Sequence, residues 1–194
     1  LGMRAELEAA LRGAIDDESI DVHYLPEIDL ATGRVVALEA LARWRHDDLG
    51  LLPASAFVGL AEDAGLIADL GAHVLTKACH HAAAWRSVDG PPAVLRVNLS
   101  ARQLRVSRLV GDIAAALVRS GLEPHRLCVE VSEASLVGDM DATLDVLRRV
   151  HELGVLVSID DFGTGHSAFA HLEQLPVDAL KVDRRFISAI TGAK

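Results

Sequence analysis

Cysteine is scarce in this 194-residue sequence, and long apolar runs are missing from it. Cys79 and Cys128 lie far apart, each within an apolar segment, which predicts two core thiols and neither a disulfide framework nor a thiolate metal site. No apolar run approaches the roughly 20 residues that a membrane-spanning helix needs. The start, Leu1 to Arg4, also lacks the apolar stretch of a signal peptide. We therefore expect a cytoplasmic protein without a membrane segment.

Basic residues are also few, because 19 Lys and Arg stand against 28 Asp and Glu and give a formal net charge of −9. Without a cluster of basic side chains the surface does not match a DNA backbone, so DNA is not an expected partner. Any other anionic partner would need the help of cations. The remaining composition is that of one folded domain, since 51% of the residues are hydrophobic and no low-complexity tract is present.

Short β-branched segments alternate with longer amphipathic ones in the second half of the chain, a pattern typical of βα units. Residues 31–33 separate two strand-like runs and predict a hairpin, so the first two strands should be antiparallel and later neighbours parallel. We predict strands at 22–30, 34–44, 93–99, 127–131, 155–160 and 179–182. We predict helices at 55–63, 69–85, 106–120, 139–153, 167–175 and 184–190.

Five of the predicted strands carry a polar residue inside or at the end of an otherwise apolar run. Parallel strands covered by helices are buried on both faces, so such residues are informative. In a parallel barrel the carboxyl ends of the strands converge on one rim, where these side chains should share a pocket. The oxygen-bearing members are Glu39, Asn98, Glu130, Asp160 and Asp161, and Lys181 lies at the end of the next strand.

This set of oxygen ligands predicts a site for hard divalent cations. Four carboxylates stay ionised in a confined site only when cations neutralise them. Oxygen ligands without His or Cys favour Mg²⁺ or Mn²⁺ over Zn²⁺, and Ca²⁺ would occupy the same ligands unproductively. A solvated edge or a helix cap would explain any single acid, and a salt bridge to Asp160 or Asp183 would explain Lys181. The repeated position on successive strands favours the shared site.

Five short motifs follow one another at these strand ends. They are Glu39-Ala40-Leu41 with Arg43 behind it, Val97 to Ser100, Glu130 to Glu133, Asp160 to Gly165, and Leu180 to Arg184. In this order they resemble the EAL domain family of bacterial cyclic di-GMP phosphodiesterases. The resemblance covers about residues 20–190 and implies a single domain over 1–194. It also implies an α/β fold, a modified TIM (β/α)8 barrel with an antiparallel first strand.

The resemblance implies a reaction, the metal-dependent hydrolysis of cyclic di-GMP to linear pGpG. Two Mg²⁺ or Mn²⁺ ions would be held, one by Glu39, Asn98, Glu130 and Asp160 and the second by Asp160 and Asp161. Lys181 would hold the attacking water, with Glu39, Asp160 and Asp161 as further catalytic residues. Arg43, unless it is only a rim charge, would contact a substrate phosphate, and Leu25 and Asp183 would lie beside the substrate.

The resemblance also implies that a second group of residues orders a loop of the active site and lies at a homodimer contact. These residues are Glu133, Phe162, Gly163, Thr164 and Gly165. In the family, the segment that corresponds to 162–165 and the glutamate that corresponds to Glu133 together keep the active site ordered. A glycine pair alone would mark only a turn, but two aspartates precede this one.

The sequence departs from the family in two places. The family's barrel continues through two more βα units that carry a further glutamate, and the sequence up to Lys194 does not contain them. We therefore expect either a longer natural protein that supplies the C-terminal portion or another chain at the unpaired edge. In a longer protein, a sensory or GGDEF-type domain is an expected partner. Leu25 stands where the family usually has Gln, which removes a hydrogen bond worth about 0.5–1.5 kcal/mol.

These departures leave a second function open: a catalytically impaired receptor or protein-interaction module that binds cyclic di-GMP. A third reading, another two-metal barrel enzyme such as an enolase-like lyase, leaves the five ordered motifs unexplained.

Overall fold

The computed structural model describes residues 2–87, 90–136, 139–163 and 174–186. They form one seven-stranded sheet in the order β1-β2-β4-β5-β6-β7, with β3 paired to β2 outside this path. The strands are β1 (Ile20–Ile28), β2 (Val35–His46), β3 (Gly50–Pro53), β4 (Val94–Leu99), β5 (Leu127–Ser132), β6 (Leu156–Phe162) and β7 (Ala179–Val182). β1 and β7 are therefore the two ends of the described path.

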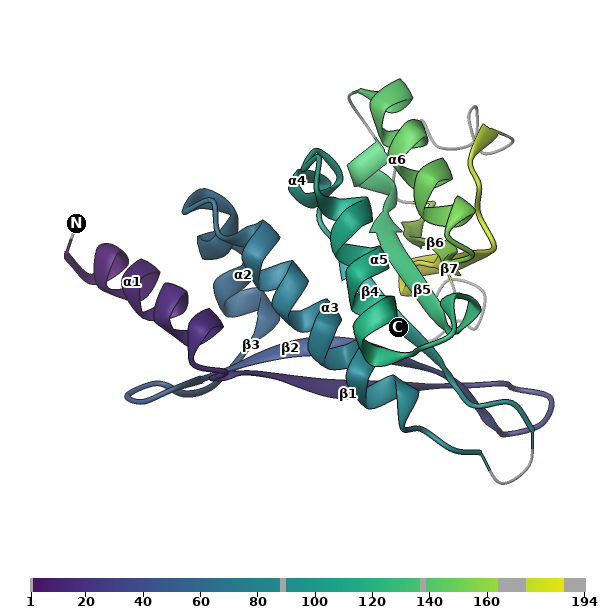
Figure 1. The fold of residues 1–194 in the computed structure, drawn as a ribbon, viewed down its shortest axis with the longest axis horizontal. Helices are drawn as coiled ribbons and strands as arrows, with labels where there is room; N and C mark the ends of the chain where they lie inside the picture. Colours follow the sequence, from purple (N-terminus) through teal and green to yellow (C-terminus); the bar gives the residue numbers. More distant parts are fainter. Residues whose placement is uncertain (1, 88–89, 137–138, 164–173, 187–194) are drawn as a thin grey trace.

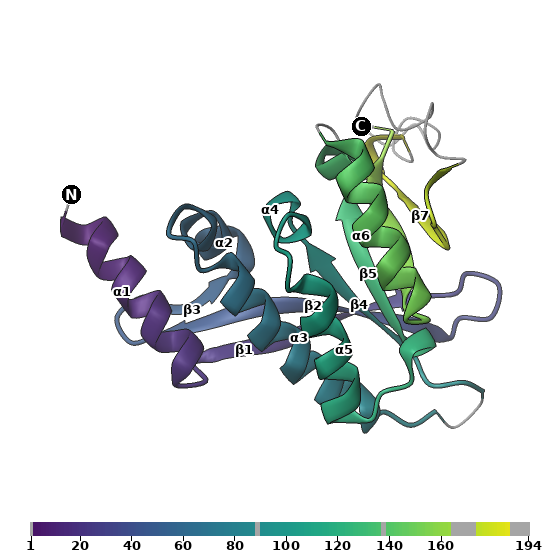
Figure 2. The same cartoon turned by 45° about the horizontal axis from the view of Figure 1, so that its top comes forward.

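The helices lie together on one side of the sheet, as Figures 1 and 2 show. They are α1 (Gly2–Asp16), α2 (Ala54–Asp63), α3 (Ile67–Ala83), α4 (Ala101–Leu104), α5 (Leu109–Ser120) and α6 (Met140–Glu152), with 3-10 turns η1 (Pro124–Arg126) and η2 (Glu133–Leu136). In the part of the chain that the structure describes, no helix is both long and apolar enough to cross a bilayer.

The first strand pair is antiparallel, and the later pairs are parallel. A tight turn joins β1 to β2, where the Asp29 carboxylate accepts hydrogen bonds from the amide and the hydroxyl of Thr32, both at 2.7 Å. Gly33 adopts a φ of 72°, a left-handed conformation that glycine reaches without steric cost. The fold is thus the predicted modified barrel, with its antiparallel first strand confirmed.

Several predicted element boundaries were wrong. Helix α1 and strand β3 were not predicted, because neither segment is preceded by a readable cap or set apart by strict alternation. The predicted helix at 106–120 begins at Leu109, and a separate short helix, α4, precedes it. Most of the predicted helix at 167–175 lies outside the described residues, as does the predicted helix at 184–190 beyond residue 186.

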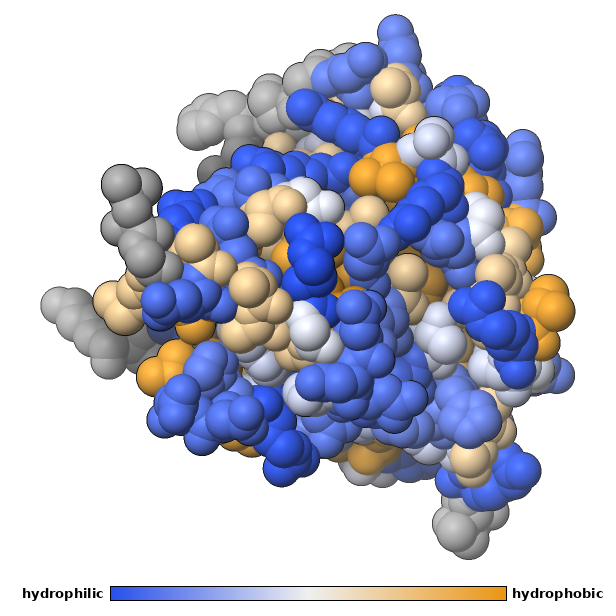
Figure 3. Space-filling view, turned by 60° about the vertical axis from the view of Figure 1, so that its left-hand side comes forward, coloured by the Kyte–Doolittle hydropathy of each residue, from blue (hydrophilic) through white to orange (hydrophobic). Residues whose placement is uncertain are grey.

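The hydrophobic core lies between the sheet and its helices. In β4, Leu95, Val97 and Leu99 are buried, whereas the alternating positions Arg96 and Asn98 face the other side of the strand. The predicted core thiols are confirmed in their burial, with Cys79 at 0% and Cys128 at 2% exposure. Hydrophilic side chains dominate the face of the molecule in Figure 3, with smaller apolar areas between them. One strand sequence thus supplies both the core and a polar inner face.

Replacing Leu95 by Ala should lower the free energy of unfolding by about 2–5 kcal/mol, because Leu95 is fully buried and the shorter side chain would leave a cavity between β4 and the helices. Urea unfolding followed by circular dichroism measures the change. Leu30→Ala is the matched control, since Leu30 is 98% exposed and its loss should cost less than about 0.5 kcal/mol. Equal losses in the two variants would contradict this assignment of the core.

Candidate active site

Polar side chains gather on the inner face of the sheet. Side chains alternate between the two faces along each strand, and the register places the inward-facing polar positions of neighbouring strands side by side. Asn98 of β4 is the register partner of Glu130 of β5, and Glu130 is in turn the partner of Ser158 of β6. One step further, Ser132 pairs with Asp160. Partners in register project to the same side of a sheet, so three predicted ligands from consecutive strands, Asn98, Glu130 and Asp160, share one face.

Lys181 lies at the centre of this face. Its Nζ donates to Glu130 Oε2 at 2.9 Å and to Glu39 Oε2 at 3.3 Å. The Asn98 amide Nδ2 donates to the other Glu39 oxygen, Oε1, at 2.8 Å. Four residues from four of the five motifs, on β2, β4, β5 and β7, are therefore linked directly. The alternative prediction of a Lys181 salt bridge to Asp160 or Asp183 was wrong in its partners, because the described ion pairs of Lys181 go to glutamates.

Glu27 and Arg96, which were not among the predicted site residues, complete this cluster. Glu27 Oε1 lies 3.3 Å from Lys181 Nζ, and Glu27 Oε2 lies 2.8 Å from Arg96 Nε. Arg96 NH1 lies 3.2 Å from Glu130 Oε1. A signal for Arg96 existed, since a charged residue in a buried parallel strand is as unusual as an acid. Glu27 gave none, because an antiparallel edge strand commonly carries polar residues.

Burial and the surrounding charges set the protonation of the cluster. Burial raises the pKa of Glu130, and the hydrogen bond and charge of Lys181 together with the charge of Arg96 oppose this rise. Burial alone would lower the pKa of Lys181, but the hydrogen bond and charge of Glu130 and the charges of Glu39 and Asp160 raise it overall. Lys181 is therefore held as an ammonium ion at neutral pH.

The aspartates at the end of β6 lie beside this cluster. Burial raises the pKa of Asp161, as do the neighbouring charges of Asp160 and Asp183. Asp161 has a φ of 54°, and its amide donates to Asp160 Oδ1 at 2.8 Å. Asp183 accepts from the amide and the Nε of Arg185 at 2.7 and 2.9 Å, and these bonds lower its pKa. No described hydrogen bond or ion pair joins these three carboxylates to Lys181 itself.

The segment after β6 is attached to η2. The buried Glu133 carboxylate accepts a hydrogen bond from the Gly163 amide at 2.8 Å through Oε2. Phe162 is partly buried against the core. The predicted association of Glu133 with the start of this loop is thus present at Gly163, whereas Thr164 and Gly165 lie outside the described residues.

Leu25 and Arg43 extend the site along β1 and β2. Leu25 is the register partner of Glu39 and is 54% exposed, so it lies directly beside one predicted ligand. Arg43 follows Glu39 by four residues and projects to the same side of β2. Its NH1 donates to the Ala42 carbonyl at 2.9 Å, and no hydrogen bond in the described part of the chain ties it to the Lys181 cluster.

The donor set is chemically suited to a hard divalent cation, although its groups are not arranged around one. Within residues 2–87, 90–136, 139–163 and 174–186, no three His, Cys, Asp or Glu side chains are placed to hold a metal ion. Glu39 and Glu130 instead share the Lys181 ammonium, while Asn98 is bonded to Glu39. Carboxylate and amide oxygens are the ligands that Mg²⁺ and Mn²⁺ take, so the residues fit such ions by type.

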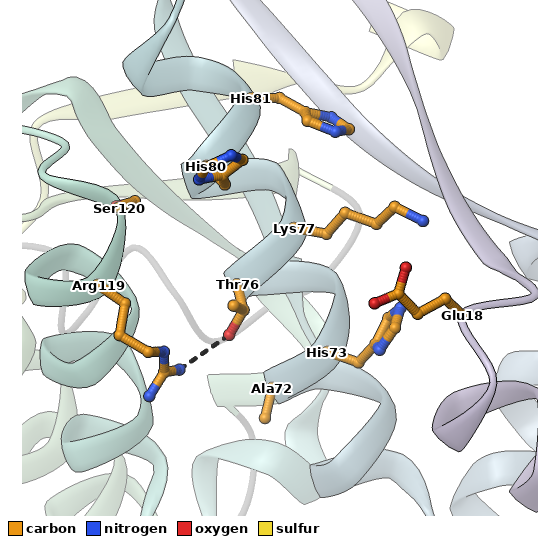
Figure 4. A pocket seen from close by; sticks show the side chains of 9 residues that line it. All are labelled: Glu18, Ala72, His73, Thr76, Lys77, His80, His81, Arg119 and Ser120. Carbon is orange, nitrogen blue, oxygen red and sulfur yellow. Dashed lines mark hydrogen bonds between the residues drawn. The ribbon is translucent and has the colours of Figure 1, made fainter.

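A hollow of about 620 Å³ lies elsewhere, on the outer side of α3 and against α5 (Figure 4). Several of its polar groups have partners within the protein. Arg119 donates to Thr76 Oγ1 at 3.0 Å, Lys77 donates to the Ile20 carbonyl at 3.0 Å, and His81 pairs with the Tyr24 hydroxyl at 2.8 Å. None of the predicted site residues lines this hollow, so it is separate from the Lys181 cluster.

Barrel enzymes place their chemistry at the carboxyl ends of the strands, and an acid-rich cluster with a lysine lies there in this fold. The EAL domain family model matches residues 8–194, and the chain belongs to this family. The cyclic di-GMP phosphodiesterase NbdA of Pseudomonas aeruginosa is 43% identical over 189 residues, covering 97% of this chain and 24% of that protein. The bifunctional diguanylate cyclase/cyclic di-GMP phosphodiesterase MucR of the same organism is 41% identical over 182 residues, covering 93% and 26%.

The chain thus spans about a quarter of the length of these two curated relatives. Among solved structures, the PaMucR phosphodiesterase in complex with cyclic di-GMP has a TM-score of 0.88 at 39% identity, covering 96% of this chain and 75% of that one. The FimX EAL domain from Pseudomonas aeruginosa bound to cyclic di-GMP has a TM-score of 0.84 at 23% identity, covering 94% and 73%. At that identity the second likeness concerns the fold alone.

Replacing Gly163 by Ala should lower the free energy of unfolding by about 1–2 kcal/mol, because Gly163 has a φ of 97° that L-residues avoid. A Cβ would also lie 2.7 Å from Phe186 Cε2. Urea unfolding measures the loss. Adding Phe186→Ala removes the contact with the new Cβ, but the stability lost to the strained backbone at residue 163 should remain.

Gly111→Ala serves as the control, since nothing lies within 4 Å of its Cβ position on helix α5. This change should stabilise the protein by about 0.5–1 kcal/mol. A Gly163→Ala protein as stable as the original would mean that the described loop conformation is wrong.

Proposed function

We propose that this domain hydrolyses cyclic di-GMP to linear pGpG in a reaction that depends on Mg²⁺ or Mn²⁺. The observation that carries the proposal is the convergence of Glu39, Asn98 and Glu130 on Lys181. These residues come from four strands between positions 39 and 181, and they unite four of the ordered motifs. The activity printed in the names of NbdA and MucR supports the same reaction.

The proposed ligands of the two cations are Glu39, Asn98, Glu130, Asp160 and Asp161. When bound, Mg²⁺ or Mn²⁺ supplies Lewis acidity toward the phosphodiester and lowers the pKa of a water molecule. Ca²⁺ would take the same ligands without supporting turnover. Glu130 is 1% exposed, so its carboxylate at the base of the site is not in contact with bulk water.

The remaining roles follow from charge and geometry. Lys181 presents an ammonium with three donors, of which the proposed reaction uses one to hold the attacking water in line with the phosphorus. The water oxygen attacks phosphorus and the bond to the ribose 3′ oxygen breaks. The released oxygen takes up the proton that the water loses, and the single product, linear pGpG, carries a 5′ phosphate and a 3′ hydroxyl. Arg43 offers a planar fork of donors for a phosphate, while Leu25 and Asp183 border the substrate.

Glu39→Gln should reduce turnover at least about a hundredfold, because the change removes the negative charge that a cation and Lys181 share. Chromatographic measurement of pGpG release in Mg²⁺ or Mn²⁺ tests this, with Ca²⁺ and a chelator as parallel conditions. Glu8→Gln is the matched control, since Glu8 pairs with Arg4 on the surface of α1. Full activity in Glu39→Gln, or turnover unaffected by chelation, would contradict the proposal.

A second candidate is a receptor that binds cyclic di-GMP without hydrolysing it. The exposed Leu25 favours this function, because an apolar side chain lies opposite Glu39, where the family usually has Gln. Binding in the presence of Mg²⁺ or Mn²⁺ without release of pGpG would identify the receptor. Two interactions do not distinguish the candidate functions. They are contact with a sensory or GGDEF-type domain in a longer protein and homodimer formation through the Glu133 segment.

Leu25→Gln should tighten cyclic di-GMP binding by about two- to tenfold, because a restored hydrogen bond contributes about 0.5–1.5 kcal/mol. Calorimetric titration in Ca²⁺, where turnover is not expected, measures the dissociation constant. Leu30→Gln makes the same chemical change in the hairpin turn, remote from the site, and should leave affinity unchanged. Equal effects of the two substitutions would exclude Leu25 from the substrate site.

A further inference from the structure

Four charged side chains beneath the mouth of the barrel form a closed ring. Lys181 Nζ lies 3.3 Å from Glu27 Oε1 and 2.9 Å from Glu130 Oε2. Arg96 closes the circle, with Nε 2.8 Å from Glu27 Oε2 and NH1 3.2 Å from Glu130 Oε1. Each cation contacts both acids, and each acid uses a different oxygen for each cation. We call these four residues the charge ring.

Apart from the neighbours β4 and β5, the charge ring joins strands that do not pair with each other. Its members come from β1, β4, β5 and β7, and β1 and β7 are the two ends of the described strand path. Their side chains are 26% exposed for Glu27 and Lys181, 16% for Arg96 and 0% for Glu130. Because these groups are largely removed from water, loss of one partner leaves another with an uncompensated charge.

The charge ring also fixes two groups that the proposed reaction uses. Lys181 and Glu130 are each held from two directions, Lys181 by Glu27 and Glu130, and Glu130 by Lys181 and Arg96. A lysine side chain has four rotatable bonds, so an ammonium with a single partner samples several positions. Two acids, together with Glu39 above, define one position for the nitrogen.

We propose that Glu27 and Arg96 are positioning residues for phosphodiester hydrolysis, acting through Lys181 and Glu130. Glu27 sets the location of the Lys181 ammonium, and Arg96 orients both acids so that their second oxygens face Lys181. The charge ring contains two negative and two positive groups, so it places these residues without adding net charge to the site. This inference rests on the proposed function, because positioning has meaning only for a reaction at Lys181.

Two variants test the charge ring while keeping side-chain volume close to the original, Glu27→Gln and Arg96→Met. Each should lower kcat at least tenfold and change KM less than threefold, because substrate-binding groups remain in place. The double variant should lose little more than either single variant, since the four residues act as one unit. Arg96→Lys should recover part of the loss of Arg96→Met. Arg45→Met, which removes an exposed ion pair to Asp21, is the matched control and should retain full kcat.

A second readout does not depend on turnover. In protein freed of metal, an amine-acylating reagent labels lysines at rates that mass spectrometry resolves residue by residue. Glu27→Gln should raise the labelling rate of Lys181 severalfold, because one of its three carboxylate contacts is lost. Lys77 is the internal reference, since its contacts with Ile20 and Asp21 lie outside the charge ring and its rate should not change.

The two readouts separate the inference from the function on which it rests. If the original protein releases no pGpG, the proposed hydrolysis fails, and the Lys181 labelling rate still decides whether Glu27 holds the ammonium. A labelling rate in Glu27→Gln equal to that of the original protein overturns the inference. Unchanged kcat in both single variants of an active protein overturns it as well, because the charge ring would then serve stability alone.

Discussion

The ammonium of Lys181 is the group on which the arrangement of the site depends. Three glutamates from three strands approach it, at 3.3 Å for Glu27 and Glu39 and 2.9 Å for Glu130. Carboxylates gathered in a partly dehydrated space repel one another and would otherwise take up protons. Glu130 and Glu39, together with Asp160, raise the pKa of Lys181 against the effect of burial, so the opposite charges persist together at neutral pH. Removing Lys181 would convert a fixed cluster into a repulsive one.

The fold can accommodate this polar interior because its hydrophobic core lies on the other side of the sheet. In β4, Leu95 and Val97 face the helices, while Arg96 and Asn98 face inward. Burial of the apolar set under α3 and α5 stabilises the strand, and the inward set is thereby free to carry charge. The cost of dehydrating Glu130 is offset locally, since both of its oxygens have cationic partners.

The sequence was sufficient to predict the barrel, its antiparallel first strand and the convergence of Glu39, Asn98, Glu130 and Lys181, because strand alternation and motif order both require them. It did not predict the partners of Lys181. Pairing with Glu27 depends on how far the sheet curls, since β1 and β7 meet through space and not through the ladder. Local patterns contain no information on that curvature. Helix α1 and strand β3 were missed for a simpler reason, their weak boundary signals.

The charges of the site are arranged in two layers with different consequences. The lower layer, the charge ring, is neutral and internally paired. The upper layer holds Asp160 and Asp161, and burial together with the charge of Asp160 raises the pKa of Asp161. In the proposed function, an anionic dinucleotide would meet like charge at this layer, and divalent cations held by the aspartates or the Arg43 guanidinium would compensate it. The proposed affinity for a phosphodiester would therefore depend on neutralising Asp160 and Asp161, whereas the Lys181 ammonium is already paired with carboxylates.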